Sequence, residues 1–124
     1  MKIQISDTAT IREIQRAFSD RFPFLKLEFF SRPHQKGKGS EKKYMKTDDA
    51  LLKDFRRVHR AGDLIIQPEM SVTELETMFH DNFGLFVQVF RRSGKLWLET
   101  TATDSWTLTL QNDQGKELSD SYSS

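Results

Sequence analysis

The sequence predicts an α+β fold made of two similar halves, and three observations lead to that prediction. First, the segment 10–22 returns at 71–83 at a constant offset and without a gap, with apolar, acidic and hydroxyl residues at matching positions. Second, both segments begin with a helix-start pattern. Third, each is preceded and followed by residues with the alternating polarity of a strand. An internal duplication is the simplest interpretation.

Two helices are predicted at the start of the repeated segments. Residues 10–13 and 71–74 have the patterns Thr-x-x-Glu and Ser-x-x-Glu, in which a hydroxyl and a carboxylate satisfy free backbone N–H groups. Apolar residues then recur at steps of three and four, so each helix has one stripe for packing on a sheet. Pro23 and Gly84 are expected to stop the helices. The stripes are Ile11, Ile14, Phe18 and Phe22, and Val72, Leu75, Phe79 and Phe83.

Strands are predicted before and after each helix. Residues 2–6 and 63–67 alternate polar and apolar side chains, which is typical of a half-buried strand. Residues 25–30 and 85–90 each place three apolar side chains on one face and a phenylalanine on the other. In the second half a short turn at 92–95 predicts a hairpin. Each half is therefore expected to contain a β-α-β-β unit.

The first half is expected to continue beyond this unit. After a polar loop at 33–43, residues 44–47 predict a returning strand, and Asp48 or Asp49 is expected to cap a helix that Gly62 ends. Residues 2–67 would then have the β-α-β-β-α-β order of a ferredoxin-like unit, a likeness of topology that implies no function.

The matching segment of the second half, residues 104–115, gives two conflicting signals. Trp106, Leu108 and Leu110 alternate with threonines, as in a strand, whereas the repeat and Gly115 favour a helix. The β-branched threonines disfavour a helix. We therefore favour a strand at 104–113, with a helix as the alternative.

Composition predicts a single domain over residues 1–118, formed by halves 1–62 and 63–118. The chain has 124 residues, 36% of them hydrophobic, and halves of about 60 residues gain stability by sharing a core. Ten Phe and two Trp supply large apolar areas for that core. Residues 119–124 are expected to form a frayed tail.

Several classes of site lack support in the sequence. The chain has no cysteine, which excludes disulfides and thiolate chemistry. The three histidines lack paired metal spacing, and residues 37–40 lack the spacing of a phosphate-binding loop, so no metal or cofactor is predicted. No apolar run approaches the ~20 residues of a membrane span, and the first residues lack a signal-peptide core. We expect a cytoplasmic protein without membrane association.

Charge is divided unevenly between the halves. Residues 1–62 contain 15 Lys/Arg and 8 Asp/Glu, a net of +7, and residues 63–124 contain 4 and 10, a net of −6; the sum is the +1 of the whole chain. Such a dipolar molecule suggests an electrostatic partner or self-association. The alternative is that solvated faces of two copies drifted apart in charge.

Candidate contact residues lie mainly in the basic half. Flexible cations beside exposed aromatic rings could follow a phosphate backbone and stack on bases. The cations are Arg32, Lys36, Lys38, Lys42, Lys43, Arg56, Arg57 and Arg60, and the aromatic residues are Phe30, Tyr44, Phe90 and Trp97. Glu41 interrupts the loop, and no RNP, KH or helix-turn-helix signature is present, so a solvated loop is the favoured interpretation.

Two matched pairs of charged residues complete the candidates. Arg32 and Arg92 follow equivalent phenylalanines, so they could hold an anion between them, or each could pair locally with a carboxylate. Asp20 and Asp81 lie near the ends of the two predicted helices, where a carboxylate is mildly unfavourable. A fixed hydrogen bond or ion pair is the favoured explanation, and a catalytic carboxylate pair is the alternative.

These observations favour a small non-catalytic interaction module whose partner is another protein or a second copy in a dimer. The first alternative is a nucleic-acid-binding accessory protein that uses the basic half. The second is a small enzyme whose site no motif identifies. A flat apolar patch would favour protein partners, exposed aromatics beside cations would favour nucleic acid, and an enclosed polar pocket would favour an enzyme.

Overall fold

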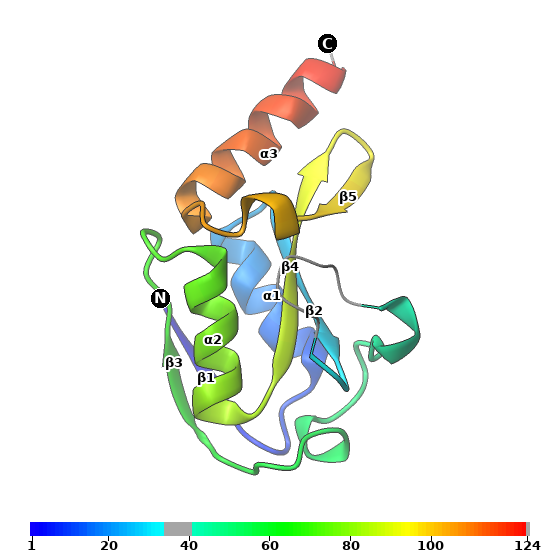
Figure 1. The fold of residues 1–124 in the computed structure, drawn as a ribbon, viewed down its shortest axis with the longest axis vertical. Helices are drawn as coiled ribbons and strands as arrows, with labels where there is room; N and C mark the ends of the chain where they lie inside the picture. The colour runs from blue at the N-terminus through cyan, green and yellow to red at the C-terminus, as the bar shows by residue number, and fades with distance from the viewer. Residues whose placement is uncertain (34–40, 124) are drawn as a thin grey trace.

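The computed structural model describes residues 1–33 and 41–123, and within these ranges the chain is an α+β protein with three α-helices and two antiparallel sheets (Figure 1). The helices are α1 (Ile11–Arg21), α2 (Val72–Phe83) and α3 (Leu108–Ser123). The strands are β1 (Lys2–Ile5), β2 (Leu25–Phe30), β3 (Gly62–Ile65), β4 (Phe86–Ser93) and β5 (Leu96–Glu99). Short 3₁₀ helices cover Lys42–Tyr44, Leu52–Asp54 and Thr101–Thr103.

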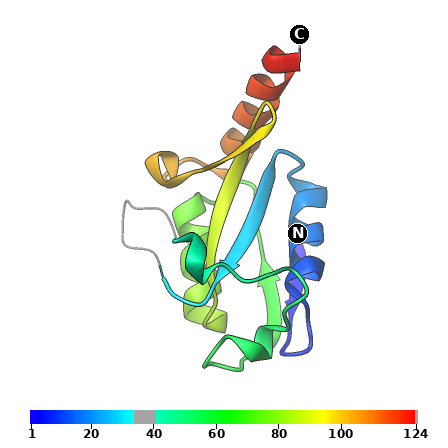
Figure 2. The same cartoon turned by 90° about the vertical axis from the view of Figure 1, so that its right-hand side faces the viewer.

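The two sheets and the first two helices enclose the core. Strands β1 and β3 pair with each other, and β2, β4 and β5 form the second sheet in that order. Helix α1 packs beside β2 and helix α2 beside β4, so both helices lie between the two sheets (Figure 1) and cover one face of the larger sheet (Figure 2). Both halves contribute to one cluster of buried apolar side chains.

The predicted helix starts are confirmed at the atomic level. The Thr10 hydroxyl accepts a hydrogen bond from the Glu13 N–H (3.2 Å), and the Ser71 hydroxyl accepts one from the Glu74 N–H (3.0 Å). At the other end of α2, Gly84 has φ of 63°, the left-handed conformation that ends many helices. These caps depend only on neighbouring residues, which is why the sequence reveals them.

The predicted apolar stripes face the core. Phe18 and Phe79 are completely buried at the centres of α1 and α2. The Phe79 ring packs edge-on against Phe29 of β2, with ring centres 5.8 Å apart, and the Phe18 ring lies 5.2 Å from that of Phe22. Both helices therefore place aromatic and aliphatic side chains in the shared core.

The same backbone contacts occur near both helix starts. An isolated bridge joins Thr10 to Leu51, and another joins Ser71 to Thr107. The backbone hydrogen bonds between each helix start and the segment that passes it match as well. Near α1 they are Ile11 N–H to the Ala50 carbonyl, Arg12 N–H to the Asp48 carbonyl and Leu52 N–H to the Ala9 carbonyl. Near α2 they are Val72 N–H to the Trp106 carbonyl, Thr73 N–H to the Asp104 carbonyl and Leu108 N–H to the Met70 carbonyl.

The region between β2 and β3 differs from its prediction. Met45 makes a single bridge with Phe30 where a strand was expected, and the helix expected before Gly62 is reduced to the 3₁₀ turn Leu52–Asp54. One reason is that Asp48 accepts two hydrogen bonds from the Arg12 guanidinium (both 3.1 Å) instead of capping a helix. The ferredoxin-like order predicted for 2–67 is absent from its described residues, since β1 and β3 form a separate sheet.

The strand predicted at 104–113 is wrong, because α3 begins at Leu108. Its threonines bond at the helix start: the Thr107 hydroxyl accepts from the Leu110 N–H (3.1 Å), and the Thr109 hydroxyl donates to the Pro68 carbonyl (3.2 Å). The helix reaches Ser123 and includes most of the segment expected to be a tail.

Gly115 lies inside α3 instead of ending a helix. A Cβ atom at this position would lie 2.8 Å from the Phe24 Cβ and 3.1 Å from its carbonyl oxygen. The glycine is therefore explained by the close approach of α3 to the turn before β2.

No helix within residues 1–33 and 41–123 combines the length and apolar character needed to cross a membrane.

We predict that Phe18→Ala and Phe79→Ala each lower the free energy of unfolding by about 3 to 5 kcal/mol, because each removes a buried ring and leaves a cavity. Urea denaturation measures the change. Leu96→Ala, at a side chain that is 65% exposed, is the control and should have a small effect. A midpoint that hardly moves for either phenylalanine would contradict its role in the core.

Candidate functional site

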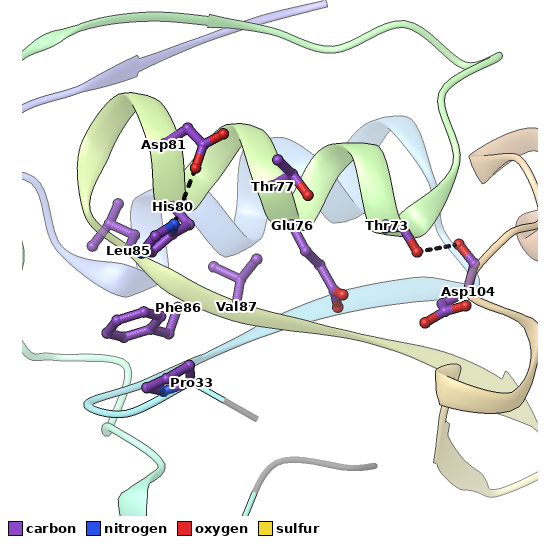
Figure 3. A pocket seen from close by; sticks show the side chains of 10 residues that line it. All are labelled: Pro33, Thr73, Glu76, Thr77, His80, Asp81, Leu85, Phe86, Val87 and Asp104. Carbon is purple, nitrogen blue, oxygen red and sulfur yellow. Dashed lines mark hydrogen bonds and ion pairs between the residues drawn. The ribbon is translucent and has the colours of Figure 1, made fainter. Parts of the chain in front are cut away.

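Two adjoining hollows lie beside α2, and together they form a surface that we call the channel. The first hollow has a volume of about 550 Å³ and lies between α2, β4 and Asp104 (Figure 3). The second, of about 450 Å³, extends past the end of α2 to residues 55–58. Pro33, His80 and Phe86 line both hollows. Each volume lies in the range of known ligand pockets.

His80 stands where the two hollows meet. Its ring stacks on that of Phe86, with centres 5.3 Å apart and planes 25° apart, and its Nδ1 lies 3.1 Å from an oxygen of Asp81. Figure 3 shows the imidazole between the Asp81 carboxylate and the Phe86 ring. The stack fixes the imidazole over an apolar part of the channel.

The first hollow is acidic. Glu76, Asp81 and Asp104 line it, and none of its described lining residues is a lysine or an arginine. Asp104 is held against the start of α2, because its carbonyl accepts hydrogen bonds from the Thr73 N–H (2.9 Å) and hydroxyl (3.1 Å). A cationic group of a ligand would therefore be favoured at this end.

The second hollow is basic. Arg32, Arg56 and Arg57 line it, and none of its described lining residues is an aspartate or a glutamate. Arg32 and Arg57 are exposed, and the Arg32 guanidinium lies over the Tyr44 ring, 4.8 Å from its centre. The channel thus changes from negative to positive along its length.

Arg56 forms part of the channel wall through an internal ion pair. It is only 5% exposed, and its Nε and Nη2 donate to the Asp7 carboxylate at 3.1 and 2.8 Å. Its Nη1 donates to the Phe83 carbonyl at 3.0 Å, at the last residue of α2. The sequence pointed to Arg56 as an anion contact, whereas the structure shows its charge paired inside the protein.

His59 completes this ion pair from the solvent side. Its Nδ1 lies 2.9 and 3.0 Å from the two oxygens of Asp7. Hydrogen bonding to His59 and then to Arg56 outweighs the cost of burial and holds the pKa of Asp7 below its ordinary value of 3.8. Asp7 therefore stays ionised and keeps Arg56 in place over the range in which most proteins work.

A difference between the two helices explains why the channel follows α2 and not α1. On α1, Gln15 donates to the Leu27 carbonyl (2.7 Å) and Ser19 donates to the Leu25 carbonyl (3.0 Å), so both side chains bond to the edge of β2. The residues at the same positions of α2 are Glu76 and His80, and both line the channel. Corresponding positions of the repeat therefore bond to a strand in the first half and line the channel in the second half.

The other predicted cations are divided among separate places. Lys42 and Lys43 are exposed on the first 3₁₀ helix, where Lys43 pairs with Glu41 at 3.3 Å and lies over Tyr44. Arg60 is exposed just before β3. Lys36 and Lys38 lie outside the described residues. The structure brings together Arg32, Lys43 and Tyr44, and separately the three arginines of the second hollow.

The predicted aromatic residues also separate. Phe30 is buried, with 1% of its surface exposed. Phe90 and Trp97 form a half-buried surface with Lys26, whose ammonium lies 5.3 and 5.1 Å from the two ring centres. Arg92 lies over the same Trp97 ring at 5.2 Å. Alternation along β2 could have revealed Lys26, because Leu25 and Leu27 point inward on either side of it.

The two matched pairs of charges do not form joint sites. Arg32 stacks on Tyr44 and Arg92 on Trp97, so each bonds locally with an aromatic ring. Asp81 contacts His80 on α2, whereas Asp20 lies on a different helix, α1. Within the ranges that the structure describes, no three His, Asp or Glu residues form a group that could hold a metal ion.

Comparisons with protein-family models, with curated proteins and with solved structures found no match for this chain. The function is therefore argued from the channel itself.

We predict that acid destabilises the protein partly through Asp7. Because its pKa is lowered on folding, its contribution to stability is complete above the ordinary pKa of 3.8 and is lost as the pH falls through the lower, folded value. Asp7→Asn should lower stability at neutral pH and reduce the loss between neutral pH and about pH 3, measured by urea denaturation. Asp48, paired with Arg12, has a pKa lowered for the same reason and will keep part of the dependence.

Asp20→Asn is the matched control for this change, because Asp20 is an exposed aspartate on α1. It should leave the acid-dependent loss as in the wild type. An equal loss in Asp7→Asn and the wild type would show that the Asp7 contacts do not stabilise the fold.

Proposed function

We propose that the protein is a small non-catalytic module that binds an extended segment of another protein in the channel. The observation that carries this proposal is the charge reversal along one continuous surface. Carboxylates line the first hollow, arginines line the second, and His80 stacked on Phe86 separates them. An extended chain with charges of opposite sign at its two ends matches this arrangement.

The chemistry of the channel suggests the order of groups in the bound segment. A lysine or arginine would lie near Asp81 and Asp104, an apolar side chain would lie on Phe86, and a carboxylate would lie near Arg32 and Arg57. Complementary charges of this kind set orientation and partner choice more than total affinity. The segment would therefore bind in one direction.

The surroundings of His80 suit it to form one wall of the binding surface. Its ring stacks on Phe86, and its Nδ1 lies 3.1 Å from the Asp81 carboxylate, so contacts on two sides fix the imidazole. A fixed flat ring offers an apolar face to a bound chain.

We predict that random heptapeptides displayed on phage, selected on the immobilised protein, enrich sequences with Lys or Arg towards one end and Asp or Glu towards the other. Asp81→Lys should weaken binding of the selected peptides about tenfold, because it replaces an attractive charge with a repulsive one. Fluorescence anisotropy with labelled peptides measures the affinity.

Asp20→Lys provides the matched control, since the same change is made at the corresponding position of α1, away from the channel. It should leave peptide affinity unchanged. Failure to enrich any charged pattern, or equal weakening by the two variants, would refute binding in the channel.

A second candidate function, binding of single-stranded nucleic acid, rests on the surface formed by Lys26, Phe90, Arg92 and Trp97. Cations beside aromatic rings are the elements of such sites. If this surface binds, a labelled oligothymidylate should bind more weakly as salt rises, and Lys26→Glu should weaken it further. Lys53→Glu, at an exposed side chain of the 3₁₀ helix Leu52–Asp54, is the control. Absence of binding at low salt would remove this candidate.

We also infer that the two halves descend from one duplicated β-α-β-β unit. The matched bridges, helix caps and crossing hydrogen bonds support this inference. Superposing the Cα atoms of residues 10–32 on those of 71–92 tests it. A helix and strand that cannot be superposed together would leave the repeat as a coincidence of pattern.

A further inference from the structure

Among residues 1–33 and 41–123, strand β5 forms an edge of the larger sheet, and some of its backbone groups have no partner strand. The Thr100 N–H donates to the Val89 carbonyl (3.3 Å). The pairing of β5 with β4 continues from these two residues, with Glu99 opposite Phe90 and Leu98 opposite Arg91. Because hydrogen-bonded positions alternate along an antiparallel pair, Leu96 and Leu98 bond to β4. The N–H and C=O groups of Trp97 and Glu99 therefore point away from the sheet.

The side chains of this edge are unusually apolar for an exposed strand. Leu96 is 65% exposed and Leu98 is 43% exposed, and both lie on one face of β5. Trp97 lies on the opposite face, directly across from Arg92 of β4. A strand that exposes both backbone groups and leucines is a ready template for another strand.

The sequence around β5 is complementary to itself in the antiparallel direction. Residues 95–99 read Lys-Leu-Trp-Leu-Glu, with a cation at one end, a carboxylate at the other and apolar residues between. Lys95 is the last residue of the turn before β5, and Glu99 is the last residue of the strand. When two β5 strands run antiparallel with Trp97 opposite Trp97, each Glu99 faces the turn residue Lys95 of the second copy. Each Leu96 then lies opposite Leu98 of the second copy.

We propose that two copies of this chain associate through antiparallel pairing of β5 with β5, about a two-fold axis at Trp97. The larger sheet would continue from one copy into the other. In this register the outward backbone groups of the two Trp97 residues pair with each other, and the lysine–glutamate pairs occur twice because the contact is symmetric. Shifting the strands by two residues would remove both ion pairs, so the charges select this register.

A second copy is favoured over an unrelated strand because residues 95–99 of one copy supply the partners for residues 95–99 of the other. Each charge then meets an opposite charge, and each leucine meets a leucine. The contact covers a short strand, so we expect a weak dimer. It also lies apart from the channel, which follows α2. Dimerisation and peptide binding can therefore fail independently.

The test is sedimentation equilibrium of the full chain at low salt, from about 10 μM to about 1 mM, the range in which a weak dimer forms. The wild type should show a monomer–dimer equilibrium. Lys95→Glu and Glu99→Lys should each raise the dissociation constant about tenfold, because each places like charges opposite one another. The double variant Lys95→Glu/Glu99→Lys should restore the wild-type constant, since it exchanges the charges without changing the pairing.

The double variant also controls for folding, because it contains both substitutions of the single variants. Lys116→Glu, an exposed change on α3, should leave the equilibrium unchanged. A wild type that stays monomeric throughout this range would overturn the proposal. So would a double variant that associates no better than the single variants.

A cross-linking experiment checks the register. The chain has no cysteine, so Trp97→Cys introduces a single thiol at the proposed two-fold axis, where opposite Cα atoms lie within disulfide reach at about 5.5 Å. Mild oxidation should give a covalent dimer that a reductant separates. Ser105→Cys, an exposed control beyond the 3₁₀ helix, should give far less. Equal cross-linking of the two variants would contradict pairing at Trp97.

Discussion

The buried guanidinium of Arg56 is the interaction on which the shape of the channel depends. A charge removed from water must be paired, and breaking such a pair by removing one partner costs several kcal/mol, about 3 to 5. Here the partners are Asp7, in the connection between β1 and α1, and the carbonyl of Phe83 at the end of α2. One side chain therefore ties three parts of the chain together. It also holds residues 55–58 against the end of α2, where they form the second hollow.

In the second half a neutral side chain makes the corresponding contact. Asn112 of α3 accepts a hydrogen bond from the Phe24 N–H (2.9 Å), in the turn between α1 and β2. Each half thus fastens the helix-to-strand turn of the other half, with an arginine in one case and an asparagine in the other. Close packing accompanies both contacts, at Gly84 against Val58 and at Gly115 against Phe24. The two halves thus have similar backbone contacts but different surface side chains. Glu76 and His80 of α2 line the channel, whereas the corresponding residues of α1 bond to β2.

The candidate site could be predicted from the sequence only in fragments. Arg32 and Arg57 were identified as cations and lie at the basic end of the channel, and Tyr44 was identified and stacks with Arg32. The acidic end was missed as a site, because Glu76 and Asp104 are far apart in sequence and neither belongs to a motif. Arg56 was assigned to the surface because composition cannot show that a charge has a buried partner.

Local contacts explain what the sequence by itself determined about this protein. The starts of α1 and α2, their buried faces and the β4–β5 hairpin depend on residues within a few positions of each other, so pattern and turn chemistry were sufficient. Only the tertiary structure decided the two segments that follow the repeated units. The Arg12 guanidinium bonds to Asp48, which was expected to cap a helix. Arg56 bonds to Asp7, which is 49 residues away in the sequence. Residues 108–123 form a helix because α3 packs on β4, where buried Gln111 bonds to Arg91 (2.8 Å). Such contacts outweigh local propensity, since they combine burial with hydrogen bonds to groups that the sequence does not place nearby.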